Sequence, residues 1–314
     1  MNIPDELQFI VNGRKKQKRT TARLDGKKCV ITGATSGVGL AAARRIAQGG
    51  ADLLLVCRNW DKASSVKDEL DDEYGVSVDL FFADFSDLDQ VRSAAAAILD
   101  STSLIDILVN NVGMHNTGRA LNRDGIEMVF CVNHLAPFLL TRLLLDRIIE
   151  SAPARILYVS SQGHRFGGLD LDDLNWDKRL YWGLKSYGAS KTAQLLTIWE
   201  FAELLADTGV TVNAVHPGGV VTNIGMNNGL VYRLYQRYLL APFLSKPDIS
   251  GEALYYLVAA PEMADTSGKF YNQTIVEKPA PHALDRVLGK RVWEISEKLT
   301  GLGTSQSIRG INDE

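Results

Sequence analysis

The chain has 314 residues, 46% hydrophobic and 23% charged, which is the composition of a globular protein long enough to bury a large core. A formal net charge of -3 at pH 7 gives no overall case for nucleic-acid binding or for a membrane-surface protein. Three widely spaced cysteines, five histidines without metal-ligand spacing, and no apolar run of about 18 residues argue against disulfides, a metal site and a membrane span, and favour a cytoplasmic location.

The N-terminal segment, residues 1–23, is basic and precedes the first predicted strand. Its cations are Arg14, Lys15, Lys16, Lys18, Arg19 and Arg23. We interpret it as a solvated, mobile extension that is dispensable for catalysis, with binding to an anionic surface or partner as the alternative. Its charges also differ from the apolar core that a signal peptide requires.

Six short β-branched segments alternate with longer segments of helical periodicity. The predicted strands are 27–32, 51–57, 76–82, 105–110, 154–160 and 210–216, with a further strand at 268–272. The predicted helices are 37–50, 61–75, 87–100, 124–150 and 187–207. Because the strands are almost continuously apolar, we expect the α/β class: a doubly wound, Rossmann-like parallel sheet with helices on both faces. We expect one domain over residues 24–303 and a tail at 304–314.

The first predicted strand runs directly into "TGATSGVG" (32–39) and then into a helix. Glycines at positions 33, 37 and 39 permit a tight turn and a close approach of a pyrophosphate to backbone N–H groups at the helix N-terminus. A purely structural strand-to-helix turn is the alternative. The position after the first strand of an alternating pattern favours dinucleotide binding.

The second predicted strand ends in Val56-Cys57-Arg58-Asn59. Enzymes that prefer NAD commonly carry an acidic residue at this point, where it binds the ribose 2′-hydroxyl. Cys57 occupies that position, and the Arg58 guanidinium suits a 2′-phosphate. We therefore expect NADP(H) rather than NAD(H), although Arg58 could also be a solvated arginine at a strand exit.

Polar residues also follow the later strands, at the carboxyl edge where open α/β sheets bind ligands. They are Asp84, the "NNVG" turn (110–113), "HPGG" (216–219) and Thr222. Ser160 and Ser161 end the fifth strand, and Tyr187 and Lys191 lie one helical turn apart in "SYGASK". A serine and a tyrosine hydroxyl that converge on one oxygen, with an ammonium lowering the tyrosine pKa, suit carbonyl–alcohol interconversion.

Six segments between residues 28 and 225 together resemble the short-chain dehydrogenase/reductase family: "TGATSGVG", "NNVG", "VNHLAPFLLT", "VSSQGH", "YGASK" and "HPGGVVT". The segments "CRN", "LDLDDLNW" and "SGKFY" resemble its retinol dehydrogenase and WW-domain oxidoreductase branch. The resemblance implies a catalytic tetrad of Asn133, Ser161, Tyr187 and Lys191, with Asn133 anchoring a water that connects Lys191 to solvent. Valine at position 112, where the family usually has alanine, is a conservative departure.

The residues expected to bind the cofactor combine the strand ends with the family motifs. They are Gly33, Thr35, Ser36, Gly37, Val38, Gly39, Arg58, Asn59, Asp84, Phe85, Asn110, Asn111, Val112, Gly113, Tyr187, Lys191, Pro217, Gly218, Val220 and Thr222. Asp84 is expected to accept a hydrogen bond from the adenine amino group.

The substrate side is expected to involve His164 and Phe166, just after Ser161, and Leu230 and Tyr235 in an apolar helical pattern. Either His164 or Phe166 could equally be a loop residue held by backbone hydrogen bonds. The segment 223–250 is interpreted as a lid over a lipophilic substrate, with a core-packing helix as the alternative. Its basic residues leave peripheral membrane contact open, and a homo-oligomer is also left open.

The expected function is NADP(H)-dependent interconversion of a carbonyl and an alcohol on a lipophilic small molecule. The alternatives are carbon–carbon double-bond reduction of the protochlorophyllide reductase type and non-catalytic sensing of a dinucleotide.

Overall fold

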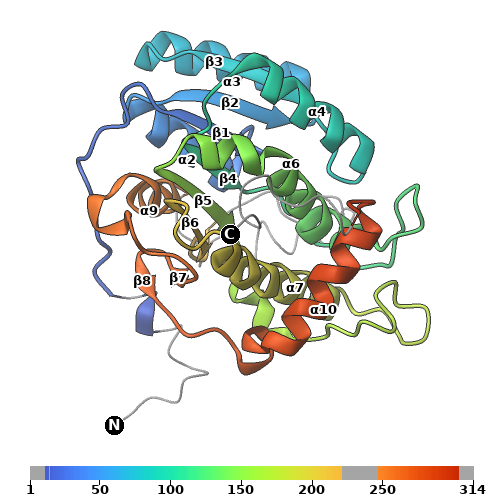
Figure 1. Ribbon diagram of the computed structural model, residues 1–314. Coiled ribbons are helices and arrows are strands. Elements are labelled where there is room, and N and C mark those ends of the chain that lie inside the picture. Colours follow the sequence, from blue (N-terminus) through green and yellow to red (C-terminus); the bar gives the residue numbers. More distant parts are fainter. Residues whose placement is uncertain (1–10, 14, 221–246, 304–314) are drawn as a thin grey trace, which may run out of the picture.

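The protein is built on an eight-stranded sheet in the order β3-β2-β1-β4-β5-β6-β7-β8 (Figure 1). The computed structural model describes residues 11–13, 15–220 and 247–303. The strands are β1 (Lys28–Thr32), β2 (Asp52–Cys57), β3 (Val78–Phe82), β4 (Ile107–Asn110), β5 (Ala154–Val159), β6 (Val210–His216), β7 (Phe270–Asn272) and β8 (Ile275–Val276). All adjacent pairs are parallel except β7 and β8, which are antiparallel. The predicted α/β fold with a doubly wound sheet is confirmed.

Helices cover both faces of the sheet, as Figure 1 shows. They are α2 (Gly37–Gln48), α3 (Trp60–Tyr74), α4 (Leu88–Ser101), α5 (Met128–Phe130), α6 (Ala136–Glu150), α7 (Gly183–Leu204), α9 (Asp248–Ala259) and α10 (Arg286–Leu299). The described residues also form the short 3-10 helices η3 (Gln162–Phe166), η6 (Pro261–Met263) and η7 (Pro281–Leu284). α7 begins four residues earlier than predicted, at Gly183, so the SYGASK segment lies inside the helix rather than at its start.

The sheet separates two hydrophobic cores because successive residues of a strand point to opposite faces. Val30 of β1 belongs to the core formed with α4, α6, α7 and α10. Its neighbours Cys29 and Ile31 belong to the core formed with α2, α3 and α9. Such burial on both faces explains why the strand segments lack polar alternation.

The predicted helix over 124–150 is interrupted by one π-helical turn, η2 (Cys131–Leu135). Met128–Glu150 as a whole is long and apolar enough to cross a membrane, but 83% of its most apolar window is buried inside the protein. Packing in the core therefore accounts for the apolar character of this stretch. A π-helical turn inside a helix commonly marks a functional position, and this one contains Asn133.

The described part of the N-terminal segment lies against the domain, so our interpretation of it as a mobile tail is wrong there. Asn12 is only 3% exposed. The Lys18 backbone N–H donates to Thr274 Oγ1 at 2.8 Å, and the Tyr255 hydroxyl donates to the Ala22 carbonyl at 2.5 Å. These long-range partners explain the error, because a single basic segment gives no sign of them in the sequence.

Candidate active site

A cavity of about 1110 Å³ lies at the carboxyl edge of the sheet. Its walls come from the loops that follow β1, β2, β3, β4, β5 and β6, together with the first turns of α7. The order of strands reverses between β1 and β4, and in open α/β sheets ligands bind beside such a reversal. The cavity is therefore placed where this fold binds ligands.

Most of the predicted cofactor residues line this cavity. The described members that do so are Gly33, Thr35, Ser36, Gly37, Val38, Gly39, Arg58, Asn59, Asp84, Phe85, Asn111, Val112, Gly113, Tyr187, Lys191, Pro217, Gly218 and Val220. Asn110 is an exception, because its side chain turns into the core and donates to Thr141 Oγ1 at 2.9 Å. Thr222, Leu230 and Tyr235, like most of the predicted lid, lie outside the described residues.

The glycine turn after β1 is held closed by the opposite loop. Gly33 and Gly37 have φ values of 71° and 58°, a region that favours glycine. A β-carbon at Gly39 would lie 2.2 Å from the Gly33 carbonyl oxygen. Asn111 Nδ2 donates to the carbonyls of Thr32 and Gly33, at 2.9 and 3.2 Å. The turn thus has the close backbone packing that places a helix N-terminus against a phosphate.

The N-terminus of α2 faces the cavity without a side-chain cap. Ser36, which precedes the helix, makes no side-chain hydrogen bond to it, and Val38 and Gly39 of its first turn line the cavity. An uncapped helix N-terminus presents N–H donors and a partial positive charge. This end of the cavity can therefore hold an anionic group.

Two cations border the cavity near the end of β2. The Arg58 side chain is 76% exposed and lies 4.0 Å from Asp84 Oδ2, too far for a strong hydrogen bond. Lys62, in the first turn of α3, also lines the cavity. Lys62 was not among the residues expected from the sequence, although its place at the start of the helix that follows the second strand was a usable signal.

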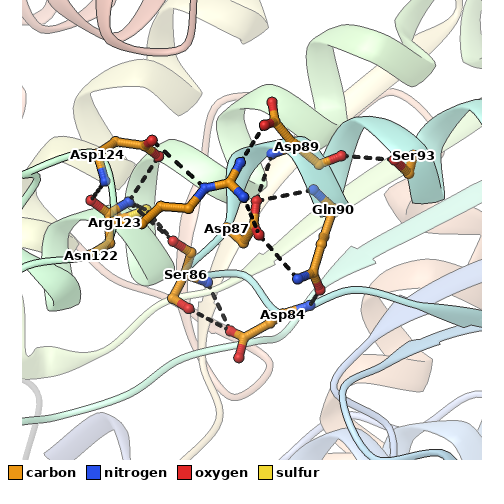
Figure 2. A network of polar contacts seen from close by, with 10 residues as sticks. Asp84, Ser86, Asp87, Asp89, Gln90, Ser93, Asn122, Arg123 and Asp124 are labelled. Atoms are coloured by element: carbon orange, nitrogen blue, oxygen red, sulfur yellow. Dashed lines mark hydrogen bonds and ion pairs between the residues drawn. The ribbon is translucent and has the colours of Figure 1, made fainter.

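The loop that carries Asp84 is fixed by a polar network (Figure 2). Asp84 Oδ1 accepts from the backbone N–H and the hydroxyl of Ser86, at 2.9 and 2.8 Å. The Asp84 backbone N–H donates to Gln90 Oε1 at 2.9 Å. Asp84 Oδ1 is therefore already engaged, and Oδ2 is the carboxylate oxygen that faces Arg58.

Arg123 anchors the same loop from the outside, lying among three carboxylates in Figure 2. Its guanidinium pairs with Asp87 at 2.9 Å, with Asp89, and with Asp124 at 3.7 Å. Asp87 in turn caps the N-terminus of α4 by accepting from the backbone of Asp89 and Gln90. The network gives this wall of the cavity a defined shape before any ligand binds.

Ser161 and Tyr187 both line the cavity and lie on either side of Gly163. A β-carbon placed on Gly163 would lie 2.5 Å from Tyr187 Cε1 and 3.3 Å from Ser161 Oγ. Ser161 Oγ accepts a hydrogen bond from the Gly163 backbone N–H at 3.0 Å. Because an oxygen lone pair makes this bond, the hydroxyl hydrogen remains able to donate to a ligand oxygen.

Lys191 also lines the cavity, one helical turn beyond Tyr187. Its Nζ is 6.0 Å from the Tyr187 ring centroid and donates to the Val159 carbonyl at 3.0 Å. Burial lowers the pKa of Lys191 to about 7, because the charged form loses hydration. The group can therefore exchange protons near neutral pH.

Asn133 lies behind the cavity wall and is fully buried. Its side chain is fixed by Met114, whose N–H donates to Oδ1 at 2.7 Å and whose carbonyl accepts from Nδ2 at 3.0 Å. The Asn133 carbonyl accepts from Gln194 Nε2 at 3.1 Å, and Gln194 Oε1 lies 3.4 Å from Lys191 Nζ. The Gln194 side chain thus joins Lys191 to the carbonyl of Asn133.

Neither His164 nor Phe166 is among the described residues that line the cavity. His164 fits the alternative reading of a loop residue held by backbone hydrogen bonds. His164 is fully buried; its Nδ1 lies 2.7 Å from the Ser161 carbonyl, and its Nε2 accepts from the Ala280 N–H at 3.1 Å. These bonds point the ring away from the cavity. Phe166 is 53% exposed on the outer surface. Both follow Ser161 closely in sequence, but the 3-10 helix η3 turns them aside.

Sequence analysis missed several apolar wall residues, among them Met114, Met128 and Val132. Ser160 and His216, which the sequence already placed at strand ends, also line the cavity, and each has a buried side-chain atom without a hydrogen-bond partner among the described residues. Within the described ranges, no group of three or more His, Cys, Asp or Glu residues is arranged to hold a metal ion.

Comparison with known proteins places this geometry in context. The family model described as short chain dehydrogenase matches residues 27–173. Human retinol dehydrogenase 13 is 37% identical over 90% of this chain and 86% of its own length. Mouse retinol dehydrogenase 12 is 36% identical over 90% of this chain and 89% of its own length. A short chain dehydrogenase from Burkholderia cenocepacia J2315 in complex with NADP has a TM-score of 0.63 and 25% identity, covering 80% of this chain and 96% of its own.

Proposed function

Because the chain belongs to the short-chain dehydrogenase/reductase family, in its retinol dehydrogenase-like branch, we propose that it interconverts a carbonyl and an alcohol on a lipophilic small molecule with NADP(H). The observation that carries this proposal is that Ser161, Tyr187 and Lys191 line the same cavity, with Ser161 and Tyr187 on either side of Gly163 and the Lys191 ammonium nitrogen 6.0 Å from the Tyr187 ring centroid. Two hydroxyls beside a titratable amine are what proton transfer to a carbonyl oxygen requires.

In this proposal the bound nicotinamide supplies or accepts the hydride, and the chain handles the proton. In reduction, Tyr187 donates its hydroxyl proton to the carbonyl oxygen as negative charge develops there. Ser161 donates a hydrogen bond to the same oxygen and holds it in place. Lys191 favours the phenolate that remains, and Gln194 and the Asn133 carbonyl connect Lys191 to the π-helical turn. In oxidation the same groups act in reverse.

The preference for NADP(H) is supported by the charges at the end of β2. Arg58 and Lys62 both border the cavity, and Cys57 replaces the acid that would repel a 2′-phosphate. Asp84 is 4.0 Å from Arg58 and does not form a close pair that would neutralise it. The NADP complex of a similar dehydrogenase is consistent with this choice.

A lipophilic substrate is supported by the character of the cavity wall and of its surroundings. Met114, Met128 and Val132 line the wall. Trp182 and Leu184 are apolar side chains that are 57% and 41% exposed. They flank Gly183, which packs directly against the cavity wall, since a β-carbon on it would lie 2.2 Å from the carbonyl oxygen of the wall residue Asn116. Exposed apolar side chains beside a ligand cavity suit an apolar ligand. The relatives named retinol dehydrogenases favour the same class.

We also propose a cytoplasmic location, with peripheral membrane contact and a homo-oligomer left open. The three free, buried cysteines are compatible with a reducing compartment. Fractionation of cells that produce the protein would test the location, and light scattering would test the oligomeric state.

A panel assay tests the function directly. Purified protein is incubated with retinaldehyde, aliphatic aldehydes, ketones and the matching alcohols, with each of NADPH, NADP, NADH and NAD. We expect turnover of at least one apolar carbonyl or alcohol, faster with NADP(H). Cofactor binding without turnover of any panel member would instead favour a sensor, and reduction confined to conjugated double bonds would favour a carbon–carbon reductase.

A further inference from the structure

Glu277, directly after β8, is a buried carboxylate outside the cavity wall, and its side chain is only 1% exposed. Four side chains donate to it. Gln162 Nε2 and Arg165 NH2 reach Oε1 at 2.7 and 2.8 Å, while Asn12 Nδ2 and Asn272 Nδ2 reach Oε2 at 3.0 and 3.1 Å. Both carboxylate oxygens are thus saturated by donors from three distant parts of the chain.

Two of these donors belong to the short helix that follows the proposed catalytic serine. Gln162 and Arg165 lie on either side of Gly163, whose N–H bonds to Ser161 Oγ. Arg165 Nε also donates to Gln162 Oε1 at 2.8 Å, so the two side chains and Glu277 form a closed triangle. Glu277 therefore holds, through Gln162 and Arg165, the turn whose Gly163 N–H orients the Ser161 hydroxyl.

The other side of Glu277 is tied to the N-terminal segment and to the β7–β8 turn. Thr274 in that turn receives the Lys18 N–H, and its own N–H and hydroxyl both donate to Gln17 Oε1, at 3.0 and 2.8 Å. Asn12 completes the contact through Glu277 itself. These bonds join residues more than 250 positions apart in the sequence.

The charge of Glu277 is stabilised where it lies. Burial disfavours the carboxylate, but hydrogen bonds from Asn12, Gln162, Arg165 and Asn272 outweigh that effect and lower the pKa of Glu277. A neutral side chain at this position would leave buried donors unsatisfied.

We propose that Glu277 is a positioning residue, through which the N-terminal segment and the β7–β8 turn hold the Ser161 loop in its catalytic geometry. The catalytic role of Ser161 in this inference rests on the proposed function. The hydrogen-bonded link between Glu277 and the Ser161 loop does not depend on it. It assigns the N-terminal segment a task in catalysis, although none of its described residues lines the cavity.

Glu277→Gln tests the link because glutamine has nearly the same shape. Its NH2 group must face one of the two donor pairs, so no orientation of the amide satisfies all four donors. Asn12→Ala removes only the hydrogen bond from the N-terminal segment to Glu277 and leaves the bonds of Gln17 and Lys18 to Thr274 in place. Lys16→Ala is the matched control in the same segment, since Lys16 is exposed. Asn213→Ala is the control for general destabilisation, because it removes a buried amide that bonds Thr266 and Lys269 instead.

Four quantities are measured for each variant: hydrogen exchange of the peptide spanning 160–168, NADPH affinity by fluorescence, and kcat and KM with an accepted carbonyl. For Glu277→Gln we expect about tenfold or faster exchange in that peptide and a fall in kcat of about 10- to 100-fold, with NADPH affinity nearly unchanged. Asn12→Ala should shift exchange and kcat in the same direction by less, and Lys16→Ala should match the parent protein.

Exchange and kcat like those of the parent in Glu277→Gln overturn the inference. The inference is also overturned if Asn213→Ala loses as much kcat as Glu277→Gln at the same loss of melting temperature, because the fall in kcat would then follow from lower stability in general. If Glu277→Gln does not fold, the comparison of Asn12→Ala with Lys16→Ala decides. A parent protein that turns over no panel substrate refutes the proposed function instead, and the exchange measurement still decides the link.

Discussion

Gly163→Ala is a sharp test of the proposed catalytic geometry, because the structure fixes the size of the disturbance. The Gly163 backbone is not left-handed, so alanine acts only through its β-carbon. That carbon would lie 2.5 Å from Tyr187 Cε1 and 2.7 Å from Cδ1, whereas ordinary contacts begin at 3.4 Å. The ring must therefore move by roughly 0.9 Å, and a misplacement of that order can cost about 10²-fold in rate.

The surrounding packing leaves α7 little room to move as a whole. Every residue of α7 from Gly188 to Trp199 is buried, so the helix is enclosed by the rest of the domain. The displacement therefore falls on the Tyr187 side chain and on the Ser161 hydroxyl beside it. We expect kcat to fall by about 10²-fold or more, with NADPH affinity largely retained, since the glycine turn and Arg58 are untouched.

The assay compares kcat, KM and NADPH affinity of Gly163→Ala with those of Gly118→Ala. Gly118 has no atom within 4 Å of its would-be β-carbon, so it controls for the glycine-to-alanine change itself. Circular dichroism checks that both variants fold. A folded Gly163→Ala protein with the kcat of the parent would refute the assignment of Tyr187 and Ser161 as the proton-transfer pair.

Three further predictions concern the cofactor and the tetrad. Tyr187→Phe should fold, bind NADPH and lose about 10²–10⁴-fold in turnover, and near-normal turnover with any accepted substrate would contradict the general-acid role. Arg58→Ala should weaken NADPH binding by about 10- to 100-fold while sparing NADH, as measured by titration; an equal loss for both would contradict the 2′-phosphate contact. Burial lowers the pKa of Lys191 from its ordinary value of 10.5 to about 7 in the folded protein, so the unfolded chain binds more protons between these values. The stability of the parent relative to Lys191→Met should therefore rise with pH over that window, by at most about 1.4 kcal/mol per pH unit, in denaturant unfolding; a difference that stays flat would contradict the buried ammonium.

The sequence by itself determined the fold and the core of the candidate site, because these depend on short-range patterns. The alternation of β-branched and helical segments indicates a parallel sheet with helices on both faces, and that sheet is observed. Three glycines after the first strand predict the turn at residues 32–39. Two of them, Gly33 and Gly37, adopt the positive φ values that glycine tolerates best, which is a local requirement of the backbone. Tyr187 and Lys191 share a helix face at a spacing of four residues, which any helical segment would give them.

Only the tertiary structure decided the features that depend on contacts between distant segments. His164 and Phe166 follow Ser161 closely, yet η3 turns one into the core and the other to the surface. Gln194 meets the Asn133 carbonyl because a π-helical turn brings that carbonyl toward α7. Asn12 donates a hydrogen bond to Glu277, which lies 265 positions away in the sequence. The basic residues around Asn12 therefore predicted a solvated tail, whereas in the folded chain this segment is bonded to the domain. No local pattern encodes such a pairing, because its free energy depends on burial and on partners that only the completed fold supplies.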